Sequence, residues 1–202
     1  MKTLQKEITD INQLDVNGFY TYADYLTWKF KERVELFKGR LMKMSPAPSF
    51  SHQDISGELF GNLYIFFKNK PCKILSAPFD VRLKDSKKPV TDSEFNTVVQ
   101  PDLVVICDLD KIDERGCKGS PDLVVEILSP GNSKKEMGIK FDLYQENKIP
   151  EYWIVDPVSP YILVYYLKDG KYLNDRPLGI DAKIQSKLFP ELDFKLKTVF
   201  DE

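Results

Sequence analysis

One stretch decides the fold of this chain: Pro121-Asp122-Leu123-Val124-Val125-Glu126-Ile127-Leu128-Ser129-Pro130. Its β-branched and leucine residues, bounded by prolines, predict a short strand that is buried on both faces. Alternate residues of a strand share a face, so Asp122 and Glu126 point the same way as Val124 and Leu128. An ionised glutamate inside such a run is costly unless a metal ion, another cation or hydrogen bonds compensate it. The sequence therefore predicts that Glu126 has a partner of this kind.

A second run, Gln100-Pro101-Asp102-Leu103-Val104-Val105-Ile106, has the same form and lies in a predicted strand over about Val98 to Ile106. If the two strands are neighbours, Asp102 and Glu126 come together as a site for a divalent metal ion. The simpler interpretation is that an aspartate after a proline begins a strand and caps a turn. We favour the simpler interpretation for Asp122, while both stay open for Asp102.

The composition is that of an ordinary globular domain, with 202 residues, 42% apolar, 12% aromatic and 30% charged. A net charge of −2 indicates no general nucleic-acid-binding surface, because strong binders carry a basic surplus. Any such contact must come from local basic patches or from a cleft neutralised by metal.

The cellular location is predicted from three observations. The segment from Met1 to Asn17 is polar and mixed in charge, unlike a secretory leader, and no apolar run is long enough for a membrane helix. The three cysteines, Cys72, Cys107 and Cys117, are odd in number and lack metal-ligand spacing, which predicts a reducing cytoplasm. Cys107 reads as a buried strand residue.

The periodicity predicts one α/β (α+β) domain with a mixed β-sheet flanked by helices. Residues 1–19 are a partly ordered lead-in, and residues 20–202 form the domain, which begins with a helix and a hairpin. A helix follows the N-cap Thr21, Gly39 permits the hairpin turn, Ser51 caps a helix to Lys68, and Ser133 caps a helix to Asn147. Further strands are predicted over about 34–37, 41–44, 72–75, 78–83, 98–106, 122–128, 151–155 and 161–167, and the C-terminal tail packs over the sheet.

An ordered set of motifs resembles the PD-(D/E)xK nuclease superfamily, and within it the bacterial Uma family of restriction endonucleases. The motifs that carry the resemblance are Val34-Glu35-Leu36-Phe37-Lys38-Gly39, Met44-Ser45-Pro46 with His52 following, Gln100-Pro101-Asp102, Pro121-Asp122-Leu123-Val124-Val125-Glu126, Ser129-Pro130, Lys140 with Tyr144, and Glu151-Tyr152-Trp153.

This resemblance implies a restriction-endonuclease-like fold and metal-dependent hydrolysis of DNA phosphodiester bonds. Mg²⁺, or Mn²⁺ in its place, is then the cofactor. On the same basis Asp102 and Glu126 are the central metal ligands, Glu35 is an outer acid that also serves as a ligand, and the carbonyl group of Ile127 adds a further ligand. The chain is expected to reach DNA through local basic patches, with a homodimer as one way to read bases.

The chain departs from the family pattern at one position. The pattern places a lysine two residues after the glutamate, where this chain has Leu128. Lys140 is the natural replacement, because it lies at the edge of the inward stripe of the next helix and its long stem can reach back to the strand ends. The alternative is that Lys140 simply extends to solvent.

Other candidates have simpler explanations. His52 lines the cleft or only begins a helix; Glu58 rivals Glu35 as the third acid or faces solvent; Asp80 lies near the active edge or at a strand irregularity. Aromatic side chains such as Tyr144 and Trp153 are more often core than stacking platforms. The pairs Lys87-Lys88 and Lys134-Lys135 contact phosphates or are solvated surface.

Three functions follow in order of preference. The first is a Mg²⁺-dependent endonuclease. The second, favoured by Leu128 and the net charge, is a catalytically inactive nuclease-fold module that binds DNA or protein. The third is a metal-dependent hydrolase of a small phosphoester.

Overall fold

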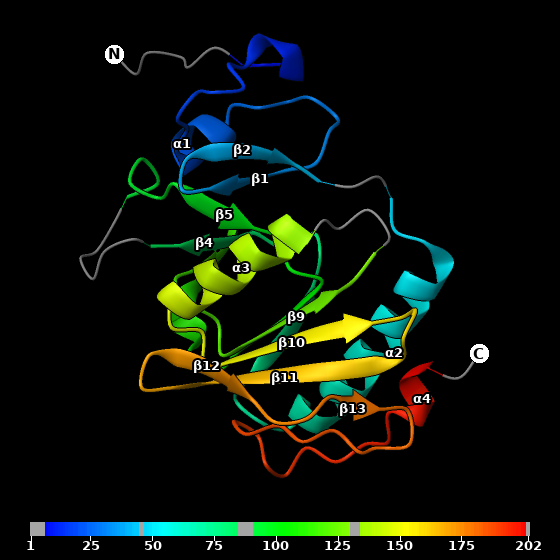
Figure 1. Ribbon diagram of the computed structural model, residues 1–202. Coiled ribbons are helices and arrows are strands. Elements are labelled where there is room, and N and C mark those ends of the chain that lie inside the picture. Colours follow the sequence, from blue (N-terminus) through cyan, green and yellow to red (C-terminus); the bar gives the residue numbers. More distant parts are fainter. Residues whose placement is uncertain (1–6, 45–46, 85–90, 130–133, 201–202) are drawn as a thin grey trace.

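The computed structural model describes residues 7–44, 47–84, 91–129 and 134–200, without the side chains of residues 134–136. Their strands form two mixed sheets (Figure 1). The smaller sheet has the order β2-β1-β5-β4-β8-β7, with β1 Val34–Phe37, β2 Arg40–Lys43, β4 Val81–Leu83, β5 Thr97–Val99, β7 Ile112–Asp113 and β8 Gly116–Lys118.

The larger sheet has the order β12-β11-β10-β9-β6-β3, and β13 pairs with β11. Its strands are β3 Lys73–Ser76, β6 Leu103–Ile106, β9 Leu123–Ile127, β10 Glu151–Asp156, β11 Tyr161–Lys168, β12 Lys171–Asn174 and β13 Leu178–Gly179. The helices are α1 Tyr22–Tyr25, α2 Phe50–Phe67, α3 Lys134–Glu146 and α4 Lys197–Phe200, with short 3₁₀ turns at Ile11–Gln13 and Leu109–Lys111. The predicted α+β class is confirmed, with two mixed sheets in place of one.

The helices cover the larger sheet on both faces, which buries β9 completely. Helices α2 and α4 pack on one face, against Leu123, Val125 and Ile127, and α3 and the smaller sheet pack on the other, against Val124. Figure 1 shows α3 between the two sheets and α2 on the far side of the larger one. The strand alternation therefore directs Glu126 toward α3 and the smaller sheet.

The predicted strand from Val98 to Ile106 is wrong, because this segment forms two strands in different sheets. β5 ends at Val99 in the smaller sheet and β6 begins at Leu103 in the larger one. Pro101 lies at the break and has no N–H group with which to continue a ladder. The crossing places Gln100 and Asp102 where the two sheets meet.

Three helix starts were predicted: Thr21 caps α1 as predicted, and the cap predicted at Ser51 is wrong. The N-cap of α2 is Ser49, whose side chain accepts from the backbone N–H of His52, so Ser51 lies inside the helix. A serine at either position satisfies the sequence pattern, and the loop before the helix decides between them. The predicted cap Ser133 lies outside the described residues.

Cys72 and Cys107 form a disulfide, which the odd number of cysteines did not predict. Strands β3 and β6 pair with Lys73 opposite Ile106, which brings the residues just beyond those strand ends together. Cys107 lies one residue after β6 and is half-buried, whereas Cys117 is a buried free thiol. Cysteine usage therefore gives no support to the predicted cytoplasmic location, and no described helix is both long and apolar enough to cross a membrane.

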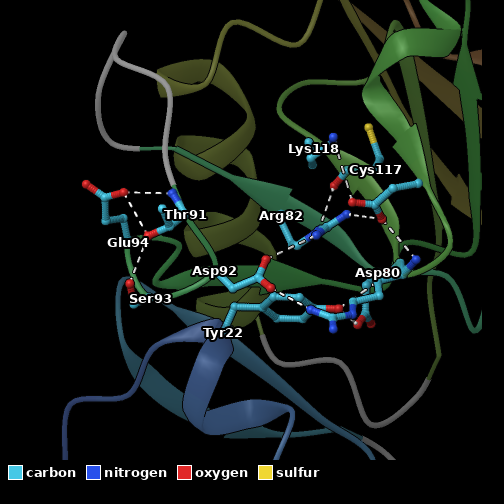
Figure 2. Close-up of polar contacts among 11 residues, drawn as sticks. Tyr22, Asp80, Arg82, Thr91, Asp92, Ser93, Glu94, Cys117 and Lys118 are labelled. Atoms are coloured by element: carbon cyan, nitrogen blue, oxygen red, sulfur yellow. Dashed lines mark hydrogen bonds and ion pairs between the residues drawn. The ribbon is translucent and has the colours of Figure 1, made fainter. Parts of the chain in front are cut away.

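Arg82, a fully buried residue of β4, links the N-terminal segment to the smaller sheet (Figure 2). Its Nη2 atom lies 2.6 Å from Oδ1 of Asp113, and Nη1 lies 3.6 Å from Oδ1 of Asp92. The guanidinium also lies 5.0 Å from the ring centre of Tyr22, whose hydroxyl donates to Asp80. Because Tyr22 belongs to α1, this network joins the N-terminal extension to β4.

Replacement of Arg82 by Met should lower the free energy of unfolding by about 2–4 kcal/mol, since it removes the cation shared by two aspartates. Urea denaturation measures this loss. The matched control is Lys118→Gln, because Lys118 lies 3.8 Å from Asp113 but is 45% exposed, and it should cost less than about 0.5 kcal/mol. Equal small losses in both variants would show that the buried network adds no stability.

Candidate active site

Glu126 has the cationic partner that its buried position in β9 demands. Its Oε1 atom lies 3.0 Å from Nζ of Lys140 and 2.6 Å from the hydroxyl of Tyr144. Lys140 and Tyr144 are four residues apart on α3 and therefore lie on one face of that helix. All three side chains are buried. The prediction that Lys140 reaches back from the helix to the strand is confirmed, and solvent exposure of Lys140 is excluded.

Lys140 also binds a second carboxylate, that of Glu35. Nζ of Lys140 lies 3.2 Å from Oε1 of Glu35, and the same oxygen accepts a hydrogen bond from the backbone N–H of Gln100. Glu35 belongs to β1 and is only 1% exposed. One ammonium group on α3 thus holds a carboxylate from each sheet. We call Glu35, Glu126, Lys140 and Tyr144 the carboxylate–lysine cluster.

Burial sets the proton affinities in this cluster. Burial raises the pKa of Glu126 to about 7, and Asp102 and Glu35 add to the rise while Lys140 opposes it. Burial lowers the pKa of Lys140, but the attraction of Glu126 and Glu35 outweighs burial, so that its pKa lies above the ordinary value. Burial and the two carboxylates also raise the pKa of Tyr144, which keeps its hydroxyl a donor. Lys140 is therefore an ammonium at neutral pH.

Asp102 lies beside the cluster, at the start of β6. Strands β6 and β9 pair with Leu103 opposite Val125. Extending this register by one residue places Asp102 opposite Glu126, on the same face of the sheet. Its Oδ2 atom accepts from the backbone N–H of Ile127 at 2.7 Å and lies 3.4 Å from Nε2 of His52. The predicted approach of Asp102 and Glu126 across neighbouring strands is confirmed.

His52 is buried in the first turn of α2 and contacts Asp102 through one ring nitrogen. Burial lowers the pKa of His52, but the hydrogen bond and charge of Asp102 outweigh burial and raise its pKa above the ordinary value. Its Nδ1 atom is buried without a hydrogen-bond partner in the described part of the chain. His52 thus orients the Asp102 carboxylate, which goes beyond the role of a simple helix-terminus residue.

The donor set agrees with a magnesium ion held by two carboxylates. The second oxygen of Asp102 and of Glu126 has no hydrogen-bond partner among the residues that the structure describes. Mg²⁺ prefers oxygen ligands and keeps several waters, so that one or two carboxylates suffice. Within the described ranges, no group of three or more His, Cys, Asp or Glu side chains could hold a metal ion. Glu35 lies against Lys140, so the three acids do not form such a group among the described residues.

The remaining described candidates lie on the surface, cap a strand or belong to the core, and none of them joins the carboxylate–lysine cluster. Glu58 is exposed on α2, and Asp122 accepts from the backbone N–H of Cys107, so it has the capping role that we favoured. Trp153 is a core residue whose Nε1–H donates to Glu151. Leu128 packs at the edge of the core beside α3. Lys87-Lys88 and the side chains of Lys134-Lys135 lie outside the described residues.

Gln100 is a site residue that sequence reasoning did not single out. Besides the bond from its backbone N–H to Glu35, its Nε2 atom donates to Asp80 at 2.9 Å and to the hydroxyl of Tyr25 at 3.2 Å. Asp80 thereby lies next to the site, linked to it through Gln100. The signal in the sequence was the position of Gln100 immediately before Pro101-Asp102, at the crossing between the sheets.

Two mixed sheets with flanking helices, and an acid–lysine cluster where they meet, define a protein with the restriction-endonuclease-like fold. A crystal structure of a "putative nuclease belonging to DUF820" from Anabaena variabilis ATCC 29413 has the same fold, with a TM-score of 0.66 and 20% identity, over 90% of this chain and 97% of that one. The chain belongs to the Uma2 family, described as "Putative restriction endonuclease", whose model matches residues 22–197. The "Uncharacterized protein slr1290" of Synechocystis sp. is 29% identical over 149 residues, 72% of this chain and 73% of that protein. Family membership supports a nuclease role.

Replacement of Lys140 by Met should destabilise the metal-free protein more at high pH than at low pH. The pKa of Glu126 in the folded state lies above its ordinary value of 4.5, so its protonation stabilises the fold at low pH, and that contribution is lost as the pH rises toward 7. Without the ammonium, no cation compensates the ionised form of the buried Glu126 carboxylate, and this matters most at about pH 8. We expect a loss of about 2–4 kcal/mol there and a smaller loss at about pH 5.

Urea denaturation in EDTA at both pH values measures this difference. The control is Lys171→Met, since Lys171 is exposed on β12 and its removal should matter at neither pH. A loss that does not depend on pH would contradict the pairing of Lys140 with Glu35 and Glu126.

Proposed function

We propose that this protein is a metal-dependent endonuclease that hydrolyses DNA phosphodiester bonds, with Asp102 and Glu126 holding Mg²⁺ or Mn²⁺. The observation that carries the proposal is the buried Lys140, whose ammonium reaches the strand acids from α3. It supplies the cation that the nuclease pattern places two residues after the glutamate, where this chain has Leu128. The bound ion would supply a Lewis acid and a water of lowered pKa.

Each residue of the candidate site then has a defined role. An ammonium group has three N–H donors, and Glu35 and Glu126 take two of those of Lys140. The third is available to orient the attacking water or to donate to a phosphate oxygen. Tyr144 fixes one oxygen of Glu126, and Ile127 and His52 fix one oxygen of Asp102, so that the other oxygen of each carboxylate would hold the ion. Glu35 serves to hold Lys140 in place.

A catalytically inactive nuclease-fold module is the second candidate function. Lys140 already makes ion pairs with two carboxylates, and the described residues lack a group of three metal-binding side chains. A closed cluster of this kind would serve as a structural link between the sheets, and the fold would then bind DNA or protein without cutting. Metal-dependent cleavage decides between the two functions.

Calorimetric titration with Mn²⁺ should detect one binding site in the wild-type protein. Asp102→Asn and Glu126→Gln should each weaken binding by about tenfold or more, since each removes a charged ligand. The matched control is Asp122→Asn, because Asp122 also begins a strand but only accepts a backbone hydrogen bond, which asparagine can accept as well. Binding unchanged in both site variants would mean that these acids hold no metal.

DNA cleavage with Mg²⁺ should fall by about a hundredfold or more in Asp102→Asn, Glu126→Gln and Lys140→Met, because each variant lacks one element of the site. Gel electrophoresis of a plasmid and of oligonucleotides measures the rate, and Asp122→Asn should cleave like the wild type. Activity that survives Lys140→Met would remove the proposed role of the ammonium. Wild-type protein that binds DNA but never cuts would favour the inactive module.

A further inference from the structure

Two hollows meet beside the candidate site. One, of about 440 Å³, is lined by Tyr25, Trp28 and Phe30 of the N-terminal segment, and the other, of about 470 Å³, has Asp102 in its wall. Arg33 and Pro78 line both hollows, which therefore adjoin. We call this continuous surface, from Tyr25, Trp28 and Phe30 past Arg33 and Pro78 to Asp102, the aromatic groove. Each hollow has the size of a pocket that holds a small organic group.

The rings of the groove pack against one another and leave part of their surface free. Trp28 and Phe30 are stacked with ring centres 5.6 Å apart and planes 28° apart, and Tyr25 lies 5.5 Å from Trp28. Their inner sides pack on the core around Leu14 and Val34, which accounts for part of each ring. All three rings are only half-buried, and the remaining surface lines the hollow. Core packing accounts for the buried sides of these rings, but it does not explain why aromatic side chains line the solvent-facing hollow.

Arg33 connects these rings to the carboxylate–lysine cluster. Its Nη2 atom donates to Oε1 of Gln100 at 2.8 Å, and the backbone N–H of Gln100 donates to Glu35. Arg33 is an exposed residue whose planar guanidinium has further donors that suit a phosphate group. Lys31 and Glu32 also line the first hollow, and their opposite charges cancel. Arg33 therefore gives the lining of this hollow a net positive charge.

We propose that the aromatic groove binds a single-stranded stretch of nucleic acid, an inference that rests on the proposed nuclease function. An unpaired base stacks on the rings of the first hollow, Arg33 binds the adjoining phosphate, and the next part of the strand reaches Asp102 in the second hollow. Stacking on aromatic rings next to a positive charge is how proteins bind single strands. The bases of a duplex are stacked on one another and offer no face to such rings. The substrate class is therefore nucleic acid with an unpaired segment.

Intrinsic fluorescence tests this directly, because the chain has two tryptophans and Trp153 is fully buried in the core. A thymidine oligonucleotide of about ten nucleotides, added in EDTA so that nothing is cleaved, should quench the emission of Trp28. It should bind about tenfold more tightly than a blunt duplex of the same length. Fluorescence anisotropy of the labelled oligonucleotide then compares the variants.

Trp28→Leu should weaken single-strand binding by about tenfold or more, since one base–aromatic stack is lost. Trp28→Phe keeps a ring and should bind nearly as the wild type does, which separates stacking from a folding defect. Arg33→Gln should weaken binding several-fold, whereas Arg176→Gln removes the same charge from an exposed position between β12 and β13 and should not. Circular dichroism and thermal melting confirm that each variant is folded.

The result that would overturn the inference is equal binding of single strand and duplex, or binding to which Trp28→Leu makes no difference. Because these titrations need no metal, they are independent of cleavage. If the protein binds single strands through Trp28 but never cuts, the proposed nuclease function is contradicted and the inference about the aromatic groove stands. If the protein cuts duplex DNA and Trp28→Leu is as active as the wild type, the nuclease function stands and the inference about the aromatic groove is contradicted.

Discussion

The position of the Lys140 ammonium between Glu35 and Glu126 is the interaction on which the rest of the site depends. It joins three elements that are distant in sequence: β1 of the smaller sheet, β9 of the larger sheet and α3 between them. Each buried carboxylate would be costly alone, and a buried lysine would be equally so. Their mutual compensation fixes how α3 lies against both sheets, and it brings the ammonium to the strand ends, where Asp102 immediately precedes β6.

The crossing at Gln100-Pro101-Asp102 is the second constraint on the site. The chain leaves the smaller sheet after Val99 and enters the larger sheet at Leu103, so that these residues belong fully to neither. The backbone of Gln100 can then bond to Glu35, while Asp102 comes into register with Glu126. A proline at the crossing removes the N–H that would have continued one strand. The same crossing brings Arg33 and the aromatic groove next to the acids.

Membership of the Uma2 family and the restriction-endonuclease-like fold agree with a nuclease. Under the proposed function, the cation would come from a helix and not from the strand that carries the glutamate. A lysine on α3 approaches Glu126 from the side of the smaller sheet, where it also meets Glu35. Its position therefore depends on the packing of two sheets and a helix, and the position of a strand lysine would depend on β9 alone.

The sequence by itself determined the class of fold and most strand and helix positions. The alternation in β9 predicted a buried Glu126 that needs a partner, because burial follows from local periodicity. Lys140 was named because of the resemblance to the nuclease pattern, and the helix spacing only allowed its side chain to reach the strand ends. Only the tertiary structure decided that Val98 to Ile106 splits between two sheets, that Cys72 meets Cys107, that His52 holds Asp102 and that Gln100 binds Glu35. Each of these depends on which segments lie side by side across dozens of residues, and that is decided by packing of whole elements and not by any pattern within one of them.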